Sequence, residues 1–527
     1  MSSPGAAGAP LMLSVSGCRG IFGRSITPEV AARFAMVVAE QLLGGSGGDQ
    51  GKRPLVVLAR DGRAAGDVLL RAAAAGLVAG GCDVLDCGVA MTPTVGVMVD
   101  AHAAAAGVIV TASHNPQEWN GLKVVMRAPS LDRGVVDACA PAKVKADAII
   151  ARFKEVSGGG EGSAPSVSLR ETAPPSAPPA GERAPAERKN FGAQGVGPLE
   201  VGTVTESPRG GLGLPGAATT THMERLKHAL KELGMHDDRR SMAIKCVVDS
   251  VNASGVEASR ELLGERLVQH VGAGTSGIFP HTPEPTRENL GSLCEFVAKK
   301  RADVGFAQDP DADRLAIIDE RGGYIGEEYT LVLCAEAVLG AMAEKGGPDA
   351  ARGKVMVINL STSRMIEDVA AKYGARVLRA AVGEANVVEL MKREDAILGG
   401  EGNGGIIWPR VTYIRDSLTA MALVIGLLAR TGKTVSQLVS EIPSYAIVKK
   451  KVDLPQLSQA APALAAVKQK YAARAAGGEV KIDEQDGVRI DFGSRGWLHV
   501  RASNTEPILR MIAEARTVEE AEGMVGG

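Results

Sequence analysis

Aromatic residues and basic runs are scarce in this sequence. Phe, Trp and Tyr make up 3% of the 527 residues, and 59 Lys plus Arg are balanced by 61 Asp plus Glu, which gives a formal net charge of −2. Proteins that bind nucleic acid gather Lys and Arg on one face and commonly stack bases on aromatic rings. We therefore expect no nucleic-acid partner.

Long apolar runs are lacking as well. The longest, Leu418–Ala429, lies between Asp416 and Arg430. It is well short of the roughly 20 residues that span a bilayer. The N-terminal residues carry no positive charge before Arg19, which argues against a secretory signal. We expect no membrane partner, and we predict that 418–429 forms a buried helix.

The cysteines show no pairing pattern. Seven are scattered along the chain, and an odd, irregularly spaced set does not indicate a disulfide framework. Such cysteines are typical of reduced core residues, which favours a cytoplasmic protein. They are Cys18, Cys82, Cys87, Cys139, Cys246, Cys294 and Cys334.

Large apolar residues become sparse between about 157 and 218, where Gly, Pro, Ser and Ala dominate. No helical or strand period is visible there, so burial cannot offset the entropy of ordering the chain. We predict a flexible insertion without chemistry. Beyond it, Thr221 and Glu224 form a capping-box pattern for a helix that ends at Gly234.

Elsewhere, short apolar runs such as 55–59 and 107–110 alternate with longer amphipathic segments. This alternation predicts parallel α/β layers, and the length predicts about three to four domains. The segment 484–507 instead resembles a β-hairpin before a short helix, so a smaller α+β domain should end the chain. Ligands of α/β sheets lie beyond the carboxyl ends of the strands. The polar turns after the predicted strands are therefore the candidate sites.

The first such turn, "QDPDADR", places Asp309, Asp311 and Asp313 at alternate positions, followed by Arg314. Three neighbouring carboxylates repel one another unless a hard cation such as Mg²⁺ neutralises them. Two alternatives remain open. One is a solvated acidic turn. The other is a calcium loop with Glu320 at its twelfth position, although Arg314 stands where that loop needs glycine.

A second turn, "RASNTEP", combines a guanidinium with hydroxyl, amide and backbone N–H donors. Such a set can surround a phosphate dianion. The alternative is an ordinary turn with a helix cap. The candidate phosphate-binding residues are Arg501, Ser503, Asn504 and Thr505.

Two glycine-rich segments complete the candidates. "GEGNGG" carries Glu401 and Asn403, whose oxygens and amide suit sugar hydroxyls, although a plain glycine turn is also consistent with it. "SGCRGIFG" places Arg19 between glycines, where it suits an anion; alone, that motif is weak.

Ser113 lies in "TASHNP", directly after the apolar run "AGVIV". It lacks the G-x-S-x-G turn of a serine hydrolase. A literal match at Gly44–Gly48 follows a helix-like segment and is better interpreted as a loop. Ser113 is instead suited to carry a phosphoryl group next to a metal held by the three aspartates.

Together these segments resemble the α-D-phosphohexomutase family in four places and in the family's order. "TASHNP" is similar to its phosphoserine loop, "DPDADR" to its metal loop, "GEGNGG" to its sugar-binding loop and "RASNTEP" to its phosphate-binding loop. The resemblance spans the chain from Arg19 to about Glu514, apart from the insertion. Any one match is weak, whereas four in order are specific.

The resemblance implies a fold of three similar mixed α/β domains and a smaller C-terminal α+β domain around a central cleft. We expect the domains at 1–156, 219–323, 324–440 and 441–527, with the insertion at 157–218. It also implies a mutase that moves a phosphoryl group through Ser113 and a hexose 1,6-bisphosphate intermediate. The resemblance implies in addition one Mg²⁺ per chain, a sugar-phosphate substrate, and a monomer or homodimer as the assembly.

The resemblance further assigns a role to each matching residue. The phosphate on Ser113 and the aspartates Asp309, Asp311 and Asp313 would hold the metal. Arg314 and His114 would lie at the transferring phosphate, with Arg19 near it, and Lys123 matches a position that transfers protons. The sugar would be bound by Glu401 and Asn403, and the unreactive phosphate by Arg501, Ser503, Asn504 and Thr505.

The chain departs from the family pattern in its sugar-binding loop. Many members have Ser and a terminal His where this chain has Asn403 and Gly405, so a histidine contact is absent or supplied from elsewhere. Glu384 in "VGEAN" is consistent with recognition of an amino sugar and equally with a solvated carboxylate. Among substrates we expect glucosamine phosphate first. Alternatives are a phosphomannomutase/phosphoglucomutase, a phosphatase, and a sugar-phosphate binding protein without activity.

Overall fold

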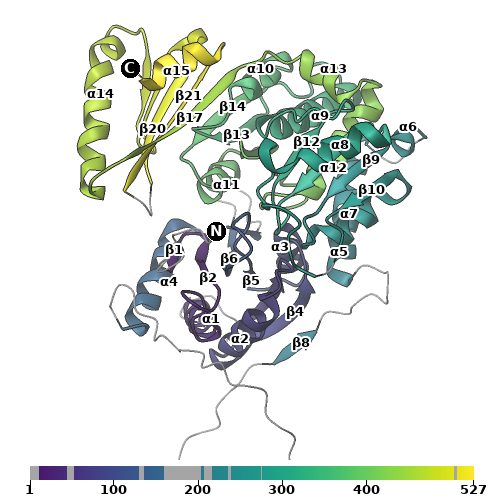
Figure 1. Ribbon diagram of the computed structural model, residues 1–527, viewed down its shortest axis with the longest axis vertical. Helices are drawn as coiled ribbons and strands as arrows, with labels where there is room; N and C mark the ends of the chain where they lie inside the picture. Colours follow the sequence, from purple (N-terminus) through teal and green to yellow (C-terminus); the bar gives the residue numbers. More distant parts are fainter. Residues whose placement is uncertain are drawn as a thin grey trace, which may run out of the picture.

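The computed structural model comprises three α/β units and a separate C-terminal unit (Figure 1). It describes residues 11–43, 53–129, 136–158, 203–206, 216–235, 239–274, 276–503 and 507–526.

The first unit is built on an eight-stranded sheet. Its central strands β3 and β5 carry almost only apolar side chains because helices cover both faces of the sheet. Helices α1, α2 and α4 supply the core on one face, and α3 supplies it on the other. The strands are β1 (Met12–Ser14), β2 (Gly17–Ile21), β3 (Leu55–Arg60), β4 (Asp83–Val89), β5 (Ala106–Val110), β6 (Trp119–Pro129), β7 (Val136–Cys139) and β8 (Val204–Glu206). The helices are α1 (Pro28–Leu43), α2 (Gly66–Ala79), α3 (Thr92–Ala101) and α4 (Lys143–Val156).

The second and third units each contain a four-stranded sheet. The second has strands β9 (Cys246–Asp249), β10 (Leu267–Val271), β11 (Val304–Gln308) and β12 (Leu315–Ile318), and helices α5 (Ala217–Leu233), α6 (Arg239–Ala243), α7 (Gly255–Leu263) and α8 (Gly291–Lys300). The third has strands β13 (Val355–Asn359), β14 (Arg376–Ala380), β15 (Leu398–Glu401) and β16 (Gly405–Ile407), and helices α9 (Glu328–Gly346), α10 (Met365–Lys372), α11 (Glu384–Arg393), α12 (Ser417–Thr431) and α13 (Val435–Ser440).

One strand order recurs in all three units: β4-β3-β5-β6, β10-β9-β11-β12 and β14-β13-β15-β16. In each, the first three strands are parallel and the fourth is antiparallel. The hairpin that joins the third strand to the fourth carries, in turn, Ser113, the aspartate triplet and the glycine-rich segment 402–404. The predicted similarity of the three domains is confirmed, and it extends to the position of their motifs.

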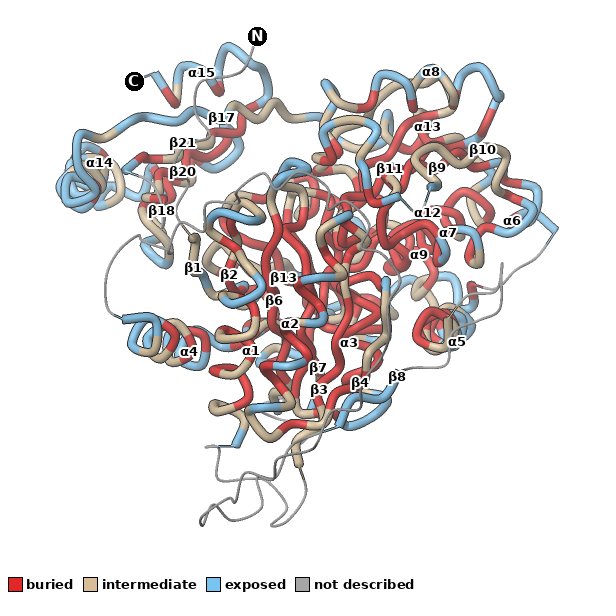
Figure 2. The backbone as a smooth tube through the Cα atoms, turned by 60° about the horizontal axis from the view of Figure 1, so that its bottom comes forward, coloured by how far each residue is buried: buried red, intermediate tan, exposed pale blue. Residues whose placement is uncertain are grey.

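Helix α12 contains the longest apolar run and is buried, as predicted. It packs against α9 in a core that the second and third units share, and Figure 2 shows both helices in the buried interior. Asp416 caps the N-terminus of α12 by accepting a hydrogen bond from the Leu418 N–H. Among the described residues, no helix is long and apolar enough to cross a membrane.

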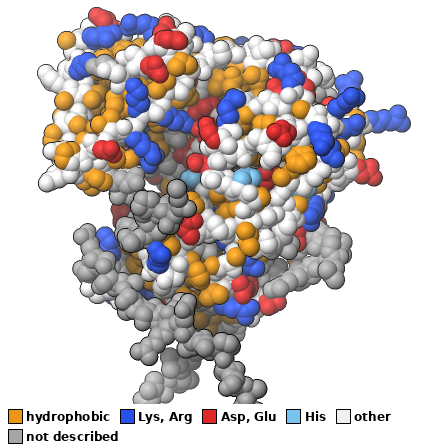
Figure 3. Space-filling model, in the orientation of Figure 1, with side chains coloured by type: hydrophobic (Ala, Val, Ile, Leu, Met, Phe, Trp, Pro, Cys, Tyr) orange, Lys and Arg blue, Asp and Glu red, His pale blue; other side chains and the backbone are white. Residues whose placement is uncertain are grey.

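The C-terminal unit is an antiparallel five-stranded sheet with its own hydrophobic core. It contacts the third unit, for example where Arg489 donates to the Leu360 carbonyl. Figure 3 shows a hollow between this unit and the rest of the molecule, with acidic and histidine side chains near it. The strands are β17 (Ala446–Asp453), β18 (Lys481–Asp483), β19 (Val488–Asp491), β20 (Trp497–Ala502) and β21 (Ile508–Ala515), and the helices are α14 (Ala460–Ala476) and α15 (Val518–Gly526).

Two local predictions differ from the structure. The predicted capping box is wrong because α5 begins at Ala217, so Thr221 lies inside the helix and donates to the Ala217 carbonyl. Strand β8 pairs with β4 inside the segment that we expected to lack secondary structure; most of that segment lies outside the described residues. Gly234 ends α5 in a left-handed conformation, as predicted, and all seven cysteines are free.

Candidate active site

Ser113 and the aspartate triplet meet although they belong to different sheets. The Ser113 hydroxyl donates to Oδ2 of Asp309 at 3.1 Å and lies 3.4 Å from Nδ1 of His114. Ser113 has a φ of 50°, in the left-handed region that non-glycine residues seldom adopt. Such a conformation persists only where the surrounding structure enforces it, and it is frequent at functional sites.

Arg63 enforces it. This arginine is 1% exposed, pairs with Asp61 at 3.0 Å, and donates to the backbone carbonyls of the Ser113 loop. The loop carbonyls it reaches include those of Asn115 and Pro116, at 2.8 and 2.7 Å. Asp61 also accepts from the Thr111 hydroxyl, which in turn accepts the Ser113 N–H. A buried ion pair thus sets the shape of the loop.

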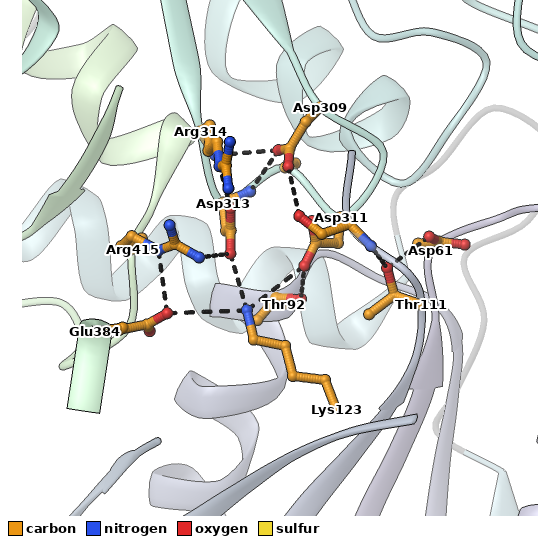
Figure 4. Close-up of polar contacts among 12 residues, drawn as sticks. Asp61, Thr92, Thr111, Lys123, Asp309, Asp311, Asp313, Arg314, Glu384 and Arg415 are labelled. Carbon is orange, nitrogen blue, oxygen red and sulfur yellow. Dashed lines mark hydrogen bonds and ion pairs between the residues drawn. The ribbon is translucent and has the colours of Figure 1, made fainter. Parts of the chain in front are cut away.

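The three aspartates form a cluster that fits a divalent cation. One ligand oxygen from each lies within 4.8 Å of the others, and all three residues are fully buried. Oδ1 of Asp311 and Oδ1 of Asp313 are buried and have no hydrogen-bond partner among the described residues. Buried carboxylate oxygens without partners are costly, and Mg²⁺ accepts such oxygen ligands. Figure 4 shows the triplet gathered on one turn.

The environment shifts the pKa values of Asp309 and Asp313 in opposite directions. Burial and the charges of Asp311 and Asp313 raise the pKa of Asp309 well above its usual value. Burial acts in the same direction on Asp313, but Arg415 and Lys123 outweigh it and lower that pKa. The charged form is therefore less favoured at Asp309 than at Asp313.

The calcium-loop alternative is not supported. Glu320 turns away from the triplet and accepts hydrogen bonds from the N–H and hydroxyl of Ser436. The segment after the triplet is strand β12, whereas a calcium loop is followed by a helix.

Lys123 lies on β6 and contacts the triplet. Its Nζ is 2.8 Å from Oδ2 of Asp313, 3.6 Å from Asp311 and 3.9 Å from Glu384. Burial opposes its charge, but Asp313, Glu384 and Asp311 outweigh that effect and raise the pKa of Lys123. The ammonium form is therefore favoured.

Three further predicted residues lie around Ser113. Arg19 donates to Asn115 at 3.3 Å, and burial lowers its pKa against the attraction of Asp311 and Asp313. Burial, followed by Arg314 and Arg19, lowers the pKa of His114 to about 2, so its imidazole is neutral. Nε of Arg314 is buried without a hydrogen-bond partner among the described residues. The two arginines, with the neutral imidazole beside them, make the surroundings of Ser113 favourable for an anion.

Arg415 joins the metal loop to the glycine-rich loop. It contacts Asp313 at 2.6 Å, Glu384 at 3.0 Å and Glu401 at 3.1 Å. Glu401 also accepts from Asn359 at 2.9 Å. Glu384 is therefore paired, and the expectation of a solvated carboxylate at this position is wrong.

The predicted phosphate-binding loop lies in the C-terminal unit. Arg501 pairs with Asp486 at 2.9 Å, and Asp486 also accepts the Val382 N–H, next to the Glu384 segment. Ser503 is buried. Asn504 and Thr505 lie outside the described residues.

Family models match the chain in four consecutive parts. They are described as phosphoglucomutase/phosphomannomutase alpha/beta/alpha domains I, II and III and the C-terminal domain, and they match residues 12–133, 221–323, 327–445 and 449–525. The chain belongs to the phosphoglucomutase/phosphomannomutase family. It is thus a phosphohexomutase, an enzyme of the isomerase class.

Relatives of this phosphohexomutase carry two kinds of name. A phosphoglucomutase/phosphomannomutase of Thermococcus kodakarensis is 33% identical over 96% of this chain and 94% of its own. A probable phosphoglucosamine mutase of Methanopyrus kandleri is 32% identical over the same shares.

Solved structures share the fold. A phosphoglucomutase/phosphomannomutase family protein of Burkholderia thailandensis has a TM-score of 0.70 at 22% identity, covering 98% of this chain and 96% of that one. The N-acetylphosphoglucosamine mutase of Aspergillus fumigatus, solved with GlcNAc-6P and magnesium, has a TM-score of 0.51 at 16% identity, covering 93% and 84%.

The sequence-based prediction missed Arg63, Thr92 and Arg415. Thr92 donates to Oδ2 of Asp311 at 2.8 Å across the interface between two units. A signal existed for Arg63, since "DGR" directly follows a buried strand. A similar signal existed for Arg415, which follows the apolar segment 411–414. Thr92 has no local signal.

Proposed function

We propose that this phosphohexomutase interconverts the 6- and 1-phosphates of a hexose by phosphoryl transfer through Ser113. The observation that carries the proposal is the 3.1 Å contact between the Ser113 hydroxyl and Asp309, inside a cluster where two buried carboxylate oxygens have no hydrogen-bond partner among the described residues. A serine held in a strained loop beside a cation site is suited to bear a phosphate rather than to attack a carbonyl.

The residues around Ser113 have separate roles in the transfer of the phosphoryl group. Mg²⁺, held by Asp309, Asp311, Asp313 and the phosphate on Ser113, supplies charge neutralisation when bound. Arg19 and Arg314 stabilise the equatorial oxygens of the transferring group, and neutral His114 donates a hydrogen bond to it. Transfer breaks the bond from phosphorus to the Ser113 oxygen and forms one to the sugar oxygen, so the sugar hydroxyl loses a proton and the Ser113 oxygen gains one. Lys123 relays this proton: it gives up the one that it holds and takes the one from the sugar hydroxyl, so its charge is unchanged at the end.

Transfer gives a hexose 1,6-bisphosphate, whose other phosphate must then reach Ser113. Glu401 and Asn403 bind sugar hydroxyls in both orientations, while Arg501, Ser503, Asn504 and Thr505 grip the phosphate that is not reacting. The intermediate has to turn over without escaping, so the C-terminal unit must close on the cleft and loosen during each cycle. The same bisphosphate acts as an activator by phosphorylating the free enzyme.

Glucosamine phosphate is the substrate that we propose first. The support is an acidic residue, Glu384, near Lys123, together with several relatives named phosphoglucosamine mutase. One relative of similar identity is named phosphoglucomutase/phosphomannomutase, which favours mannose or glucose phosphates as the second candidate. A cytoplasmic location, and a monomer or homodimer as the assembly, belong to the same proposal.

Two measurements test it. Intact-mass spectrometry of the purified chain should show an addition of about 80 Da, the mass of one phosphoryl group, that Ser113→Ala removes together with turnover. Coupled assays with glucosamine 6-phosphate, mannose 6-phosphate and glucose 6-phosphate, run side by side, identify the substrate. Turnover by Ser113→Ala at the wild-type rate would exclude the mechanism, and release of inorganic phosphate without isomerisation would indicate a phosphatase.

A further inference from the structure

We propose that Arg415 is a positioning residue that sets the metal loop and the sugar-binding loop together. Its three guanidinium nitrogens are divided among three carboxylates from three segments: Nη2 contacts Asp313, Nε contacts Glu384 and Nη1 contacts Glu401. The inference rests on the proposed function, because it gives Asp313 to the metal and Glu401 to the sugar.

The contact between Arg415 and Asp313 occupies one carboxylate oxygen of Asp313 and leaves the other for a metal ion. Arg415 and Lys123 both donate to Oδ2 of Asp313, while Oδ1 is buried without a hydrogen-bond partner among the described residues and lies 3.9 Å from Nε of Arg314. The two cations therefore fix the rotation of the carboxylate and leave Oδ1 free of hydrogen bonds. Groups that orient a metal ligand in this way affect metal affinity although they do not touch the metal.

The contact with Glu401 constrains the sugar-binding loop. Oε1 of Glu401 accepts from Asn359, and Oε2 accepts from Arg415, so both oxygens are already oriented before a sugar arrives. A planar guanidinium serves three acceptors at fixed angles, whereas a lysine ammonium has no such fork. Arg415 therefore determines where Glu401 and Glu384 present their remaining lone pairs.

The backbone around Arg415 is anchored to the same two loops. The Asp416 N–H donates to the Ile406 carbonyl in β16, and the Ser417 hydroxyl donates to the Ala312 carbonyl in the metal loop. The loops also contact each other directly, because the Leu315 N–H donates to the Gly404 carbonyl at 3.0 Å. Arg415 thus stands on a rigid bridge between them.

Gly405 makes room for this arrangement. A Cβ at position 405 would lie 2.3 Å from Cδ of Arg415, too close for the arginine stem to keep its place. The position where many family members have histidine is therefore filled here by the stem of Arg415. Any side chain at 405 should displace Arg415 without removing a ligand.

The test compares Arg415→Lys, Arg415→Met and Gly405→Ala with the wild type. Mn²⁺ binding is measured by electron paramagnetic resonance, and kcat and KM are measured for the three hexose 6-phosphates. Arg415→Lys keeps the positive charge but loses the planar set of three nitrogens. The variant should therefore bind Mn²⁺ at least about 10-fold more weakly than the wild type, as is usual when a group that orients a metal ligand is changed. It should also change the ratio of kcat/KM between hexoses, which a general loss of stability leaves unchanged.

Gly405→Ala should have the same effects as Arg415→Lys. The double variant Gly405→Ala with Arg415→Met should be no worse than Arg415→Met alone, because both changes act through one side chain. The matched control is Arg430→Lys, at the far end of α12, about 20 Å away by the helical rise. It should leave Mn²⁺ binding and the hexose ratio as in the wild type.

The outcomes separate this inference from the proposed function. Suppose that Arg415→Lys binds Mn²⁺ as the wild type does and that Arg415→Met binds it more tightly. Arg415 then acts only as a positive charge that repels the metal, which overturns the inference and leaves the proposed function standing. An unchanged hexose ratio in all three variants also overturns it. A wild-type chain that binds no Mn²⁺ and carries no phosphoryl group overturns the proposed function and the inference with it.

Discussion

The hydroxyl of Ser113 lies 3.1 Å from a carboxylate oxygen of Asp309, although 196 residues separate the two in the sequence. The two residues occupy equivalent hairpins of different α/β units. Their contact depends on how the first unit packs against the second, and Thr92 reinforces it by donating to Asp311. The stability of that interface and the chemistry of the site are therefore linked.

Mg²⁺ should stabilise the folded chain because it neutralises three buried carboxylates. At a concentration 100 times its Kd, a ligand that binds only the folded state adds about 2.7 kcal/mol. Differential scanning fluorimetry with Mg²⁺ or EDTA should show a higher melting temperature with the metal, and Asp311→Asn should remove most of the increase. Asp319→Asn is the control, because Asp319 caps its own turn. An undiminished increase in Asp311→Asn would contradict the metal assignment.

Removing the guanidinium of Arg63 should destabilise the chain strongly. Asp61 and Arg63 are both almost fully buried, and Arg63→Met leaves an uncompensated carboxyl group, which costs about 3–5 kcal/mol. Urea denaturation measures this loss. The control Arg71→Met breaks an exposed pair with Asp67 and should cost about 0.2–1 kcal/mol. Equal losses in the two variants would show that Arg63 does not hold the loop.

Glu328 should make stability depend on pH. Burial raises the pKa of this carboxyl group to about 8, above the 4.5 of an unhindered glutamate, so the folded state holds a proton that the unfolded state releases. Stability from this group is fully present below pH 4.5. It falls as pH rises through about 8, by up to about 1.4 kcal/mol per pH unit.

The isosteric Glu328→Gln variant isolates that effect, because it cannot ionise. Urea midpoints between pH 5 and 9 should converge at low pH, with the variant becoming the more stable at high pH. Glu328 also borders the sugar-binding loop, since a Cβ on Gly402 would lie 2.2 Å from its carboxylate oxygens. Parallel pH profiles for the variant and the wild type would refute the assignment.

Arg501→Met should weaken substrate binding more than it slows turnover. A charge-assisted hydrogen bond to phosphate contributes about 1.5–3 kcal/mol, so KM for the hexose phosphate should rise about 10- to 100-fold. Steady-state assays separate KM from kcat. The control is Arg495→Met. Arg495 belongs to the same unit and lies in a turn, Gly493–Arg495, that contains no buried residue. A fall in kcat alone would place Arg501 at the transferring phosphate.

The motif residues of the candidate site are easier to predict from the sequence than the residues that hold them in place. Ser113, the triplet and Glu401 stand in short motifs whose residue types indicate a chemistry, and the structure brings Ser113 and the triplet together. Arg63 and Arg415 each follow a buried segment, but that signal does not identify the groups they contact, which lie far away in the sequence. The separations from Arg63 to Ser113 and from Arg415 to Asp313 are 50 and 102 residues.

Some local signals hold and one fails: the helix predicted at 418–429 occurs as α12, whereas the capping box at Thr221 does not form. The strand predicted at 55–59 occurs as β3 because a continuous apolar run can only be buried on both faces. The capping box at Thr221 failed because burial of Ala218 and Thr219 extends α5 by a turn beyond it. Tertiary packing there outweighs a cap that contributes about 1 kcal/mol.

The repeated strand order gives each α/β unit one equivalent turn, and the three turns are built separately from one another. The pairing of the strands that flank a turn does not depend on the side chains at its tip. Substitutions in one turn should therefore change one part of the site at a time and leave the three sheets intact.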